Sequence, residues 1–308
     1  MKNIFFFLLT IAFAMASCTK DKTDYEAELE TTTPKNQEFK EAIIIQDEHL
    51  SVVVETLNGK FYKGYNEIHV EILDLTKGER VEAEAVTIFP LLIQEGRGLT
   101  ACPHSERFEF DAEKKHYQGF SIFAAESTSN TKGELFINVM IKGQKHVFQK
   151  GINIESQENK NLNMTLFTGN DDEKRLIALV SPQYPIVGEN KLVAGLYKFE
   201  KVTDSHAIEL PRAVEYIYTQ VNDYLLLLDP RMPEPSMGNH SSPGNKDLLQ
   251  REDDFYHGVV NYTMTGNWTL NFILQDNKGK IIKGTQVSKE FTPGIKGEKS
   301  ELFIDVLF

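Results

Sequence analysis

The residues best suited to chemistry in this sequence are two methionines and a histidine in one short segment. Met232, Met237 and His240 all fall within the segment 229–243, which is rich in Pro and Gly. Thioether sulfur is a soft, neutral ligand that favours Cu(I) over harder ions, and imidazole binds copper in both oxidation states. A loop that carries these three side chains could therefore form a three-coordinate Cu(I) site.

The same segment also has an interpretation in which no metal takes part. Methionine side chains fill irregular gaps in hydrophobic cores, and Pro233 and Pro235 could simply shape a long connection between strands. We expect the loop to be flexible before it binds an ion, so binding would carry an ordering cost. Metal binding and loop packing are both open at this point.

Cys102 and His104 form a second pair that could hold a metal ion. A thiolate and an imidazole two positions apart can reach the same ion, and cysteine is a strong Cu(I) ligand. A free cysteine, however, usually behaves as a small buried hydrophobe, and Pro103 between the two restricts the backbone. Here too, core packing is the alternative to a metal site.

Short alternating segments position these residues. Apolar side chains recur at every second residue over 68–72, 135–141 and 268–274, the period of half-buried strands. Turn signals such as Asn58-Gly59 and Lys142-Gly143 bound such segments. The best helical candidate is 208–218. This pattern predicts an all-β fold.

The chain also resembles itself at a distance of roughly 125 to 140 residues. We therefore predict two tandem immunoglobulin-like β-sandwiches, 46–168 and 175–308, with the acidic segment 169–174 as the linker. An up-and-down barrel is the alternative. The matches, in chain order, are Gly64-Tyr65-Asn66 with Gly188-Glu189-Asn190, Pro90 with Pro230, Cys102–Ser105 with Asn239–Ser242, His116–Gly119 with Phe255–Gly258, and Gly133 and Asn138 with Gly266 and Asn271.

The N-terminus indicates export and a lipid anchor. Residues 1–17 have a basic start and an apolar run too short to span a bilayer, which is typical of a signal peptide. Met15-Ala16-Ser17-Cys18 resembles the lipobox of bacterial lipoproteins, which implies cleavage before Cys18 and acylation of that residue. Residues 18–45 read as a flexible polar tether. We expect a membrane-anchored envelope protein, on the outer membrane of a Gram-negative bacterium.

The second half resembles the YtkA-like family, which is related to FixH-like proteins. The resemblance covers Val221 to Gly279 and rests on the Met/His loop, the strand Phe255-Tyr256-His257-Gly258 and the turn Met264-Thr265-Gly266-Asn267-Trp268. It implies a small β-sandwich of the bacterial envelope that is linked to copper handling or oxidase assembly. The first half is a degenerate copy, with Pro90-Leu91-Leu92 in place of the methionine-rich stretch.

We form expectations for four further residues beside these motifs. Trp268 and Met264 are expected to fill the core, and His116 and His257 to lie at the surface or at a strand edge.

The net charge and the absence of common catalytic motifs reduce the number of function classes that fit this sequence. The formal net charge of −12 argues against nucleic-acid binding, and none of the common catalytic motifs occurs. The sequence therefore predicts a non-catalytic envelope lipoprotein that binds Cu(I) or another soft metal, or assists an envelope partner that does. The alternative is a tethered interaction module that binds protein or glycan without metal.

Overall fold

The structure is a computed structural model that describes residues 38–203 and 214–307. Within these ranges it confirms an all-β fold, because every regular element is a strand apart from the single 3-10 turn Lys160–Leu162. No helix in the described ranges is long and apolar enough to cross a membrane. The signal peptide and Cys18 lie outside the described residues.

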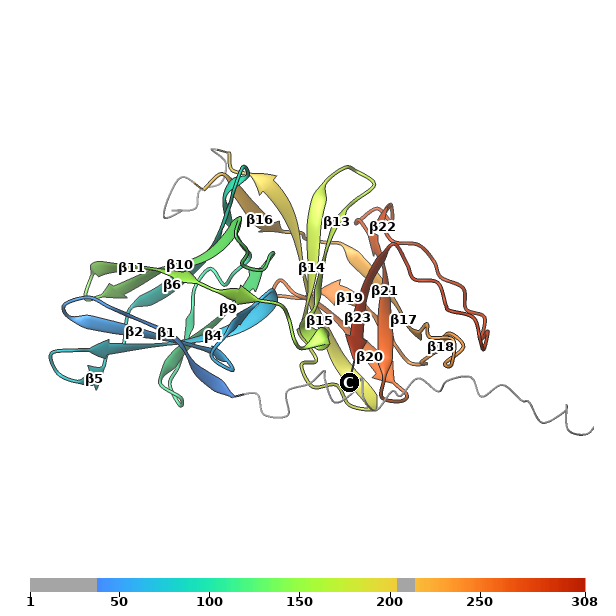
Figure 1. Cartoon of the computed structure of the whole chain (residues 1–308), viewed down its shortest axis with the longest axis horizontal. Helices are drawn as coiled ribbons and strands as arrows, with labels where there is room; N and C mark the ends of the chain where they lie inside the picture. Colours follow the sequence, from blue (N-terminus) through green and yellow to red (C-terminus); the bar gives the residue numbers. More distant parts are fainter. Residues whose placement is uncertain (1–37, 204–213, 308) are drawn as a thin grey trace, which may run out of the picture.

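The first half packs two sheets around one core (Figure 1). Its side chains alternate as predicted, so Ile68, Val70 and Ile72 on β4 face Leu135, Ile137 and Val139 on β10 in the same core. One sheet has the order β1-β2-β4-β9-β8, with β5 beside β4, and the other is β11-β10-β6-β7. The strands are β1 (Phe39–Gln46), β2 (Leu50–Leu57), β3 (Phe61–Tyr62), β4 (Gly64–Asp74), β5 (Glu79–Arg80), β6 (Ala85–Gln94), β7 (Gly98–Ala101), β8 (Glu109–Asp111), β9 (His116–Phe123), β10 (Thr131–Ile141), β11 (Gln144–Ile152) and β12 (Ile154–Glu155).

The second half builds its own core from two layers. Trp268 is fully buried there among leucines of β21 and aromatic residues of β20, which confirms its predicted role. One layer is β13-β14-β15-β20-β19, and it continues through the pairing of β19 with β17 into the other layer, which is β17 and β21 with β18, β22 and β23 at their sides. The strands are β13 (Met164–Thr168), β14 (Lys174–Ser181), β15 (Gly188–Lys201), β16 (Tyr216–Gln220), β17 (Leu225–Met232), β18 (His240–Ser241), β19 (Lys246–Gln250), β20 (Tyr256–Tyr262), β21 (Asn267–Gln275), β22 (Ile281–Lys283) and β23 (Leu302–Leu307).

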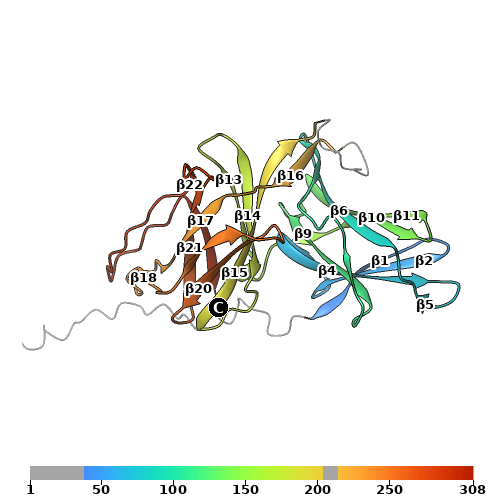
Figure 2. The ribbon, with the colours of Figure 1, turned by 180° about the vertical axis from the view of Figure 1, so that it is seen from behind.

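The two halves share structure instead of being joined by a linker alone. On β14, Leu176 and Ala178 belong to the first core, while Ile177 and Leu179 belong to the second. Strand β16 pairs antiparallel with β15 and parallel with β7, so hydrogen bonding runs unbroken from one half to the other. Both views place β14 and β15 between the halves (Figures 1 and 2).

Equivalent local structures in the two halves support a duplication. The Asn66 amide bonds the backbone of Tyr62 and Gly64, and the Asn190 amide bonds the backbone of Ile186 and Gly188 in the same way. Both glycines have positive φ, 93° and 120°, which glycine adopts without strain. The strand register agrees, since Gly64 pairs with Phe123 and Gly188 pairs with Tyr262.

Around Pro90 and Pro230, the strand pairing differs by two residues from the alignment of the two halves. Pro90 pairs with Leu135 and Pro230 pairs with Leu270. The predicted match of Gly133 with Gly266 would instead make Leu135 equivalent to Trp268. The proline match and the glycine match therefore cannot both hold in one register.

Three predictions about local structure were wrong. Residues 39–45 of the predicted tether form strand β1, because Ala42, Ile43 and Ile45 pack against the first core. The predicted linker 169–174 is the turn of the β13–β14 hairpin, where Asp171 makes a two-bond ion pair with the buried Arg175 at 2.8 and 2.7 Å. Residues 216–218 of the best helical candidate lie in β16, and its residues 208–213 lie outside the described ranges.

Candidate metal site

Strand register places two of the three predicted ligands opposite each other. Met232, the last residue of β17, pairs with His240, the first residue of β18. Directly opposed residues on antiparallel strands have Cβ atoms roughly 5 Å apart. Met232 is only 2% exposed and belongs to the second core, whereas His240 is half-buried.

Met237 lies in the turn that connects these two strands. Its backbone N–H donates to the Glu234 carbonyl at 2.9 Å, and the His240 N–H donates to the Met237 carbonyl at 3.0 Å. The Met237 side chain is half-buried against the second core. The three predicted ligands thus belong to one hairpin, with Met232 inside, His240 near the surface and Met237 in the turn between them.

The turn is held by a second segment, contrary to the expectation of a flexible loop. The Asn239 amide donates to the carbonyls of Ser288 and Glu290 at 2.8 and 3.2 Å. The Thr292 N–H donates to the Gly238 carbonyl, and the Gly297 N–H donates to that of Pro233. Because these bonds order the turn without any ion, an ion would meet a largely preformed hairpin and a smaller ordering cost.

The β20–β21 turn supplies contacts that the sequence analysis missed. The Thr263 hydroxyl lies 2.9 Å from Nε2 of His240, and the Trp268 ring lies edge-on to that imidazole with centroids 6.2 Å apart. Trp268 Nε1 donates to the Met264 carbonyl at 3.0 Å. Met264 itself is 36% exposed, so the expectation that it fills the core was wrong. Met264 and Trp268 belong to the same segment, Met264-Thr265-Gly266-Asn267-Trp268, and this shared turn was the available signal for the contact.

Gly266 makes room for Met232 in the same turn. A Cβ built on Gly266 would lie 2.9 Å from Cε of Met232, which is closer than real Cβ atoms approach a neighbour. The φ of Gly266 is 130°, a value that L side chains rarely adopt. The glycine of the turn therefore positions the Met232 thioether.

Cys102 and His104 have different surroundings from each other. The Cys102 thiol is buried in the first core, and burial raises its pKa to about 12, so it is not a thiolate near neutral pH. His104 Nδ1 lies 2.7 Å from the backbone carbonyl of Cys102, and its ring packs edge-on against Phe89. Burial lowers the pKa of His104. These contacts fit core packing better than a shared metal ion.

His116 and His257, which were both expected at the surface or at a strand edge, differ in their surroundings. His116 is only 6% exposed, and its ring stacks on that of His69 with centroids 3.9 Å apart, so the expectation of a surface position was wrong. His257 lies on β20 beside Asp253, with Nε2 2.9 Å from the carboxylate. Among the described residues, no group of three or more His, Cys, Asp and Glu side chains could hold a metal ion.

Comparisons with known proteins assign no family to this chain. No profile of a known protein family matches the chain, and no curated protein matches it. One solved structure, described as the crystal structure of the conserved domain protein from Bacillus anthracis, is 12% identical and has a TM-score of 0.26. The similarity covers 94% of this chain and 95% of that one.

Proposed function

We propose that this protein is a non-catalytic lipoprotein of the cell envelope that binds Cu(I), or another soft metal, at one end of its second sandwich. Met232, Met237 and His240 are the proposed ligands. The observation that carries the proposal is the direct cross-strand pairing of Met232 with His240. Two soft or borderline donors side by side, with a third in the connecting turn, suit Cu(I) better than Ca²⁺ or Mg²⁺.

Two further contacts support a binding role for this hairpin. The bond between Thr263 and Nε2 orients the His240 ring, and outer contacts of this kind commonly hold an imidazole ligand in place. Nδ1 is then the nitrogen we assign to the metal. Met237 lies in the clamped turn, where little conformational freedom is lost on binding.

The envelope part of the proposal rests on the N-terminus. The lipobox-like segment that ends at Cys18 supports acylation there, and the resemblance to YtkA-like proteins supports an envelope role in copper handling. We propose attachment to the outer membrane of a Gram-negative bacterium, with a further envelope protein as the donor or acceptor of the metal.

Trp268 provides a direct test, because it is the only tryptophan in the chain and its ring touches the proposed site. Titration with Cu(I), or with Ag(I) as an air-stable substitute, should change Trp268 fluorescence in a saturable, one-to-one manner. The combined variant Met232→Leu, Met237→Leu and His240→Gln should lose the response, since it removes both sulfurs and the imidazole at small cost to packing.

A matched control keeps this test specific. Met164→Leu removes a half-buried thioether on β13 and should leave the titration unchanged. An identical response in the combined variant would contradict the proposed site.

A groove in the second half favours the alternative function as an interaction module. It has a volume of about 840 Å³ and lies over the outer face of β17 and β21, with Leu227, Ile273 and Val287 beside the ion pair of Asp229 and Arg231. Mixed apolar and polar linings of this size are typical of ligand sites. Binding to a glycan or peptide array that is lost in Ile273→Arg, but kept in Met232→Leu, would support this function.

A further inference from the structure

A connecting loop in the second half exposes an apolar run. Tyr184, Ile186 and Val187 are 53%, 62% and 54% exposed, and all lie in the β14–β15 connection. Single exposed apolar residues are normal on protein surfaces, but contiguous ones mark contact sites.

This exposure is not a requirement of the fold. In the first half, the side-chain amide of Asn66 is hydrogen-bonded to the backbone N–H and carbonyl of Tyr62, and Tyr62 is 6% exposed. In the second half, Asn190 holds Ile186 by the same pair of bonds, at 2.9 and 2.7 Å, yet the side chain faces outward. The same pair of asparagine hydrogen bonds therefore holds a buried Tyr62 in the first half and an exposed Ile186 in the second half.

A second exposed apolar side chain lies at the same end of the sheet. The β15–β20 pairing ends at Gly188 and Tyr262, so the loop that precedes Gly188 and the turn that follows Tyr262 leave the sheet together. Met264, in that turn, is 36% exposed. We name Tyr184, Ile186, Val187 and Met264 the apolar end patch.

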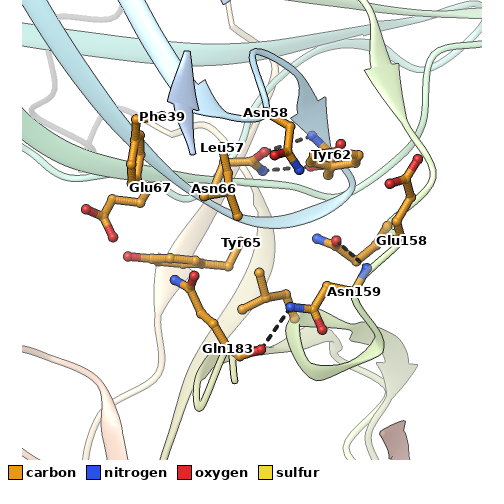
Figure 3. A pocket seen from close by; sticks show the side chains of 12 residues that line it. Phe39, Leu57, Asn58, Tyr62, Tyr65, Asn66, Glu67, Glu158, Asn159 and Gln183 are labelled. Atoms are coloured by element: carbon orange, nitrogen blue, oxygen red, sulfur yellow. Dashed lines mark hydrogen bonds between the residues drawn. The ribbon is translucent and has the colours of Figure 1, made fainter. Parts of the chain in front are cut away.

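The N-terminal part of the chain enters the body beside this patch. Phe39, the first residue of β1, lines a hollow together with Tyr65 and with Gln183 of the apolar loop. Figure 3 shows Tyr65 between Phe39 and Gln183, and the Gln183 carbonyl accepts a 3.0 Å hydrogen bond from Asn159. Residues 19–38 therefore separate Cys18 from Phe39, which lies next to the apolar loop, a span of at most roughly 75 Å when fully extended.

We propose that the apolar end patch rests on the lipid bilayer to which Cys18 anchors the protein. This rests on the proposed lipid anchor. Three or four partly inserted side chains bind a bilayer weakly by themselves, but a tether raises their effective concentration at the surface. The acyl chains on Cys18 would anchor the chain, and the apolar end patch would set the orientation of the body on the bilayer.

The hairpin that carries Met232 and His240 contacts the turn that carries Met264. Thr263, which contacts His240 at 2.9 Å, is the neighbour of Met264 in the chain. Docking of the apolar end patch would thus hold the proposed Cu(I) site close to the bilayer, where a membrane-embedded donor or acceptor of the ion can reach it.

The test uses the full lipidated chain in phosphatidylethanolamine and phosphatidylglycerol vesicles. An environment-sensitive dye is attached at Ile186→Cys and, as the matched control, at Ile281→Cys. Ile281 is 44% exposed and pairs with Gln275, at the far end of β21 from the Met264 turn. Cys102 is 1% exposed, so it should not take up the dye.

We expect the dye at position 186 to shift to shorter wavelength and to be quenched several-fold more by nitroxide-labelled lipid than the dye at position 281. Equal quenching at both positions would overturn the proposal. A shift that occurs only in native membranes, and not in pure lipid vesicles, would overturn it in favour of a protein partner. Flotation of the parent and of Cys18→Ser tests the anchor separately; if the anchor fails, quenching at position 186 at high lipid concentration still decides the role of the patch.

Discussion

His116 shows how a single residue couples the first half to pH. Its ring stacks on His69, which in turn stacks on Phe39 of β1, with centroids 3.9 and 3.8 Å apart. Burial lowers the pKa of His116, and the nearby His69 and Lys114 lower it further, against the opposing effect of Asp111 and Glu55. No hydrogen-bond partner within the described residues reaches its buried Nε2.

Acidification should therefore destabilise the protein through His116. Because its pKa is lower in the folded state, the unfolded chain binds more protons below about pH 6.5, and the free energy of unfolding falls as the pH falls through that value. Urea unfolding at pH 7.5 and 5.5 measures the loss, which should be smaller in His116→Gln than in the parent. The exposed His49 gives the control, since His49→Gln should lose as much stability as the parent. Equal losses in all three chains would contradict the prediction.

Residue types predicted the candidate ligands, but not their environment. The spacing of eight positions between Met232 and His240 is compatible with a hairpin, and the pairing of the two residues follows from the strand register. The burial of Met232 and the exposure of Met264 depend on which side chains meet across two sheets. That information is absent from local spacing, so the two methionines could not be ranked beforehand.

At the scale of elements, the β20–β21 turn positions the proposed site. Gly266 has a φ of 130°. A Cβ atom built on this glycine would lie 2.9 Å from Cε of Met232. The turn also carries Met264, whose carbonyl accepts from Trp268. A change at Gly266 should therefore act on packing and on metal binding together.

Gly266→Ala should displace Met232 and weaken Cu(I) binding in the Trp268 titration. It should also destabilise the fold by about 2 kcal/mol, from backbone strain and crowding together. Gly279→Ala is the matched control, because Gly279 has a φ of 79° but no heavy atom within 4 Å of its Cβ site. That variant should lose stability from backbone strain alone and should keep its affinity. Equal affinity in both variants would show that Gly266 does not position the thioether.

Strands with a clear two-residue period were predictable, while strands without it were not. The alternation at 68–72, 135–141 and 268–274 lies within β4, β10 and β21. Strand β1 was missed because the run Ala42-Ile43-Ile44-Ile45 follows a long polar stretch and does not alternate. Pairing with β2 and packing on the first core fix it as a strand.

At the scale of the whole molecule, the central strands belong to both cores. Leu176 packs into the first core and its neighbour Ile177 into the second, and a small cluster of Phe89, Val214 and Ile217 joins β6 to the β16 region. Either half alone would expose one apolar face of β14. We therefore expect the described body to unfold as one cooperative unit.

Two intrinsic probes can check this cooperativity in the Cys18→Ser chain. Trp268 fluorescence reports the second core, and the reactivity of the buried Cys102 thiol reports the first. Both probes should give the same urea midpoint. Leu176→Ala should lower the free energy of unfolding by about 3 kcal/mol and should therefore lower the midpoint of both signals together. Two separate midpoints, with Leu176→Ala moving the Cys102 signal alone, would mean that the halves unfold independently.

Equivalent local structures in the two halves could be predicted from the sequence, but the shared sheet could not. The match of Asn66 with Asn190 identifies two asparagines that make equivalent hydrogen bonds to the backbone four residues earlier. Alternation along 176–179 shows two apolar faces without showing that each face meets a different core. Partners of those faces, such as Ile68 in the first core and Trp268 in the second, lie far away along the chain and beyond any local pattern.

The most direct test of the central claim is an anaerobic Cu(I) titration of the Cys18→Ser chain against a competing chelator. We predict that one Cu(I) binds per chain, that this binding is lost when Met232, Met237 and His240 are replaced together by Leu, Leu and Gln, and that Cys102→Ala leaves it unchanged. Binding that survives the triple replacement but disappears in Cys102→Ala would move the site to the first half. An absence of binding in the parent would contradict the metal function and leave the tethered interaction module.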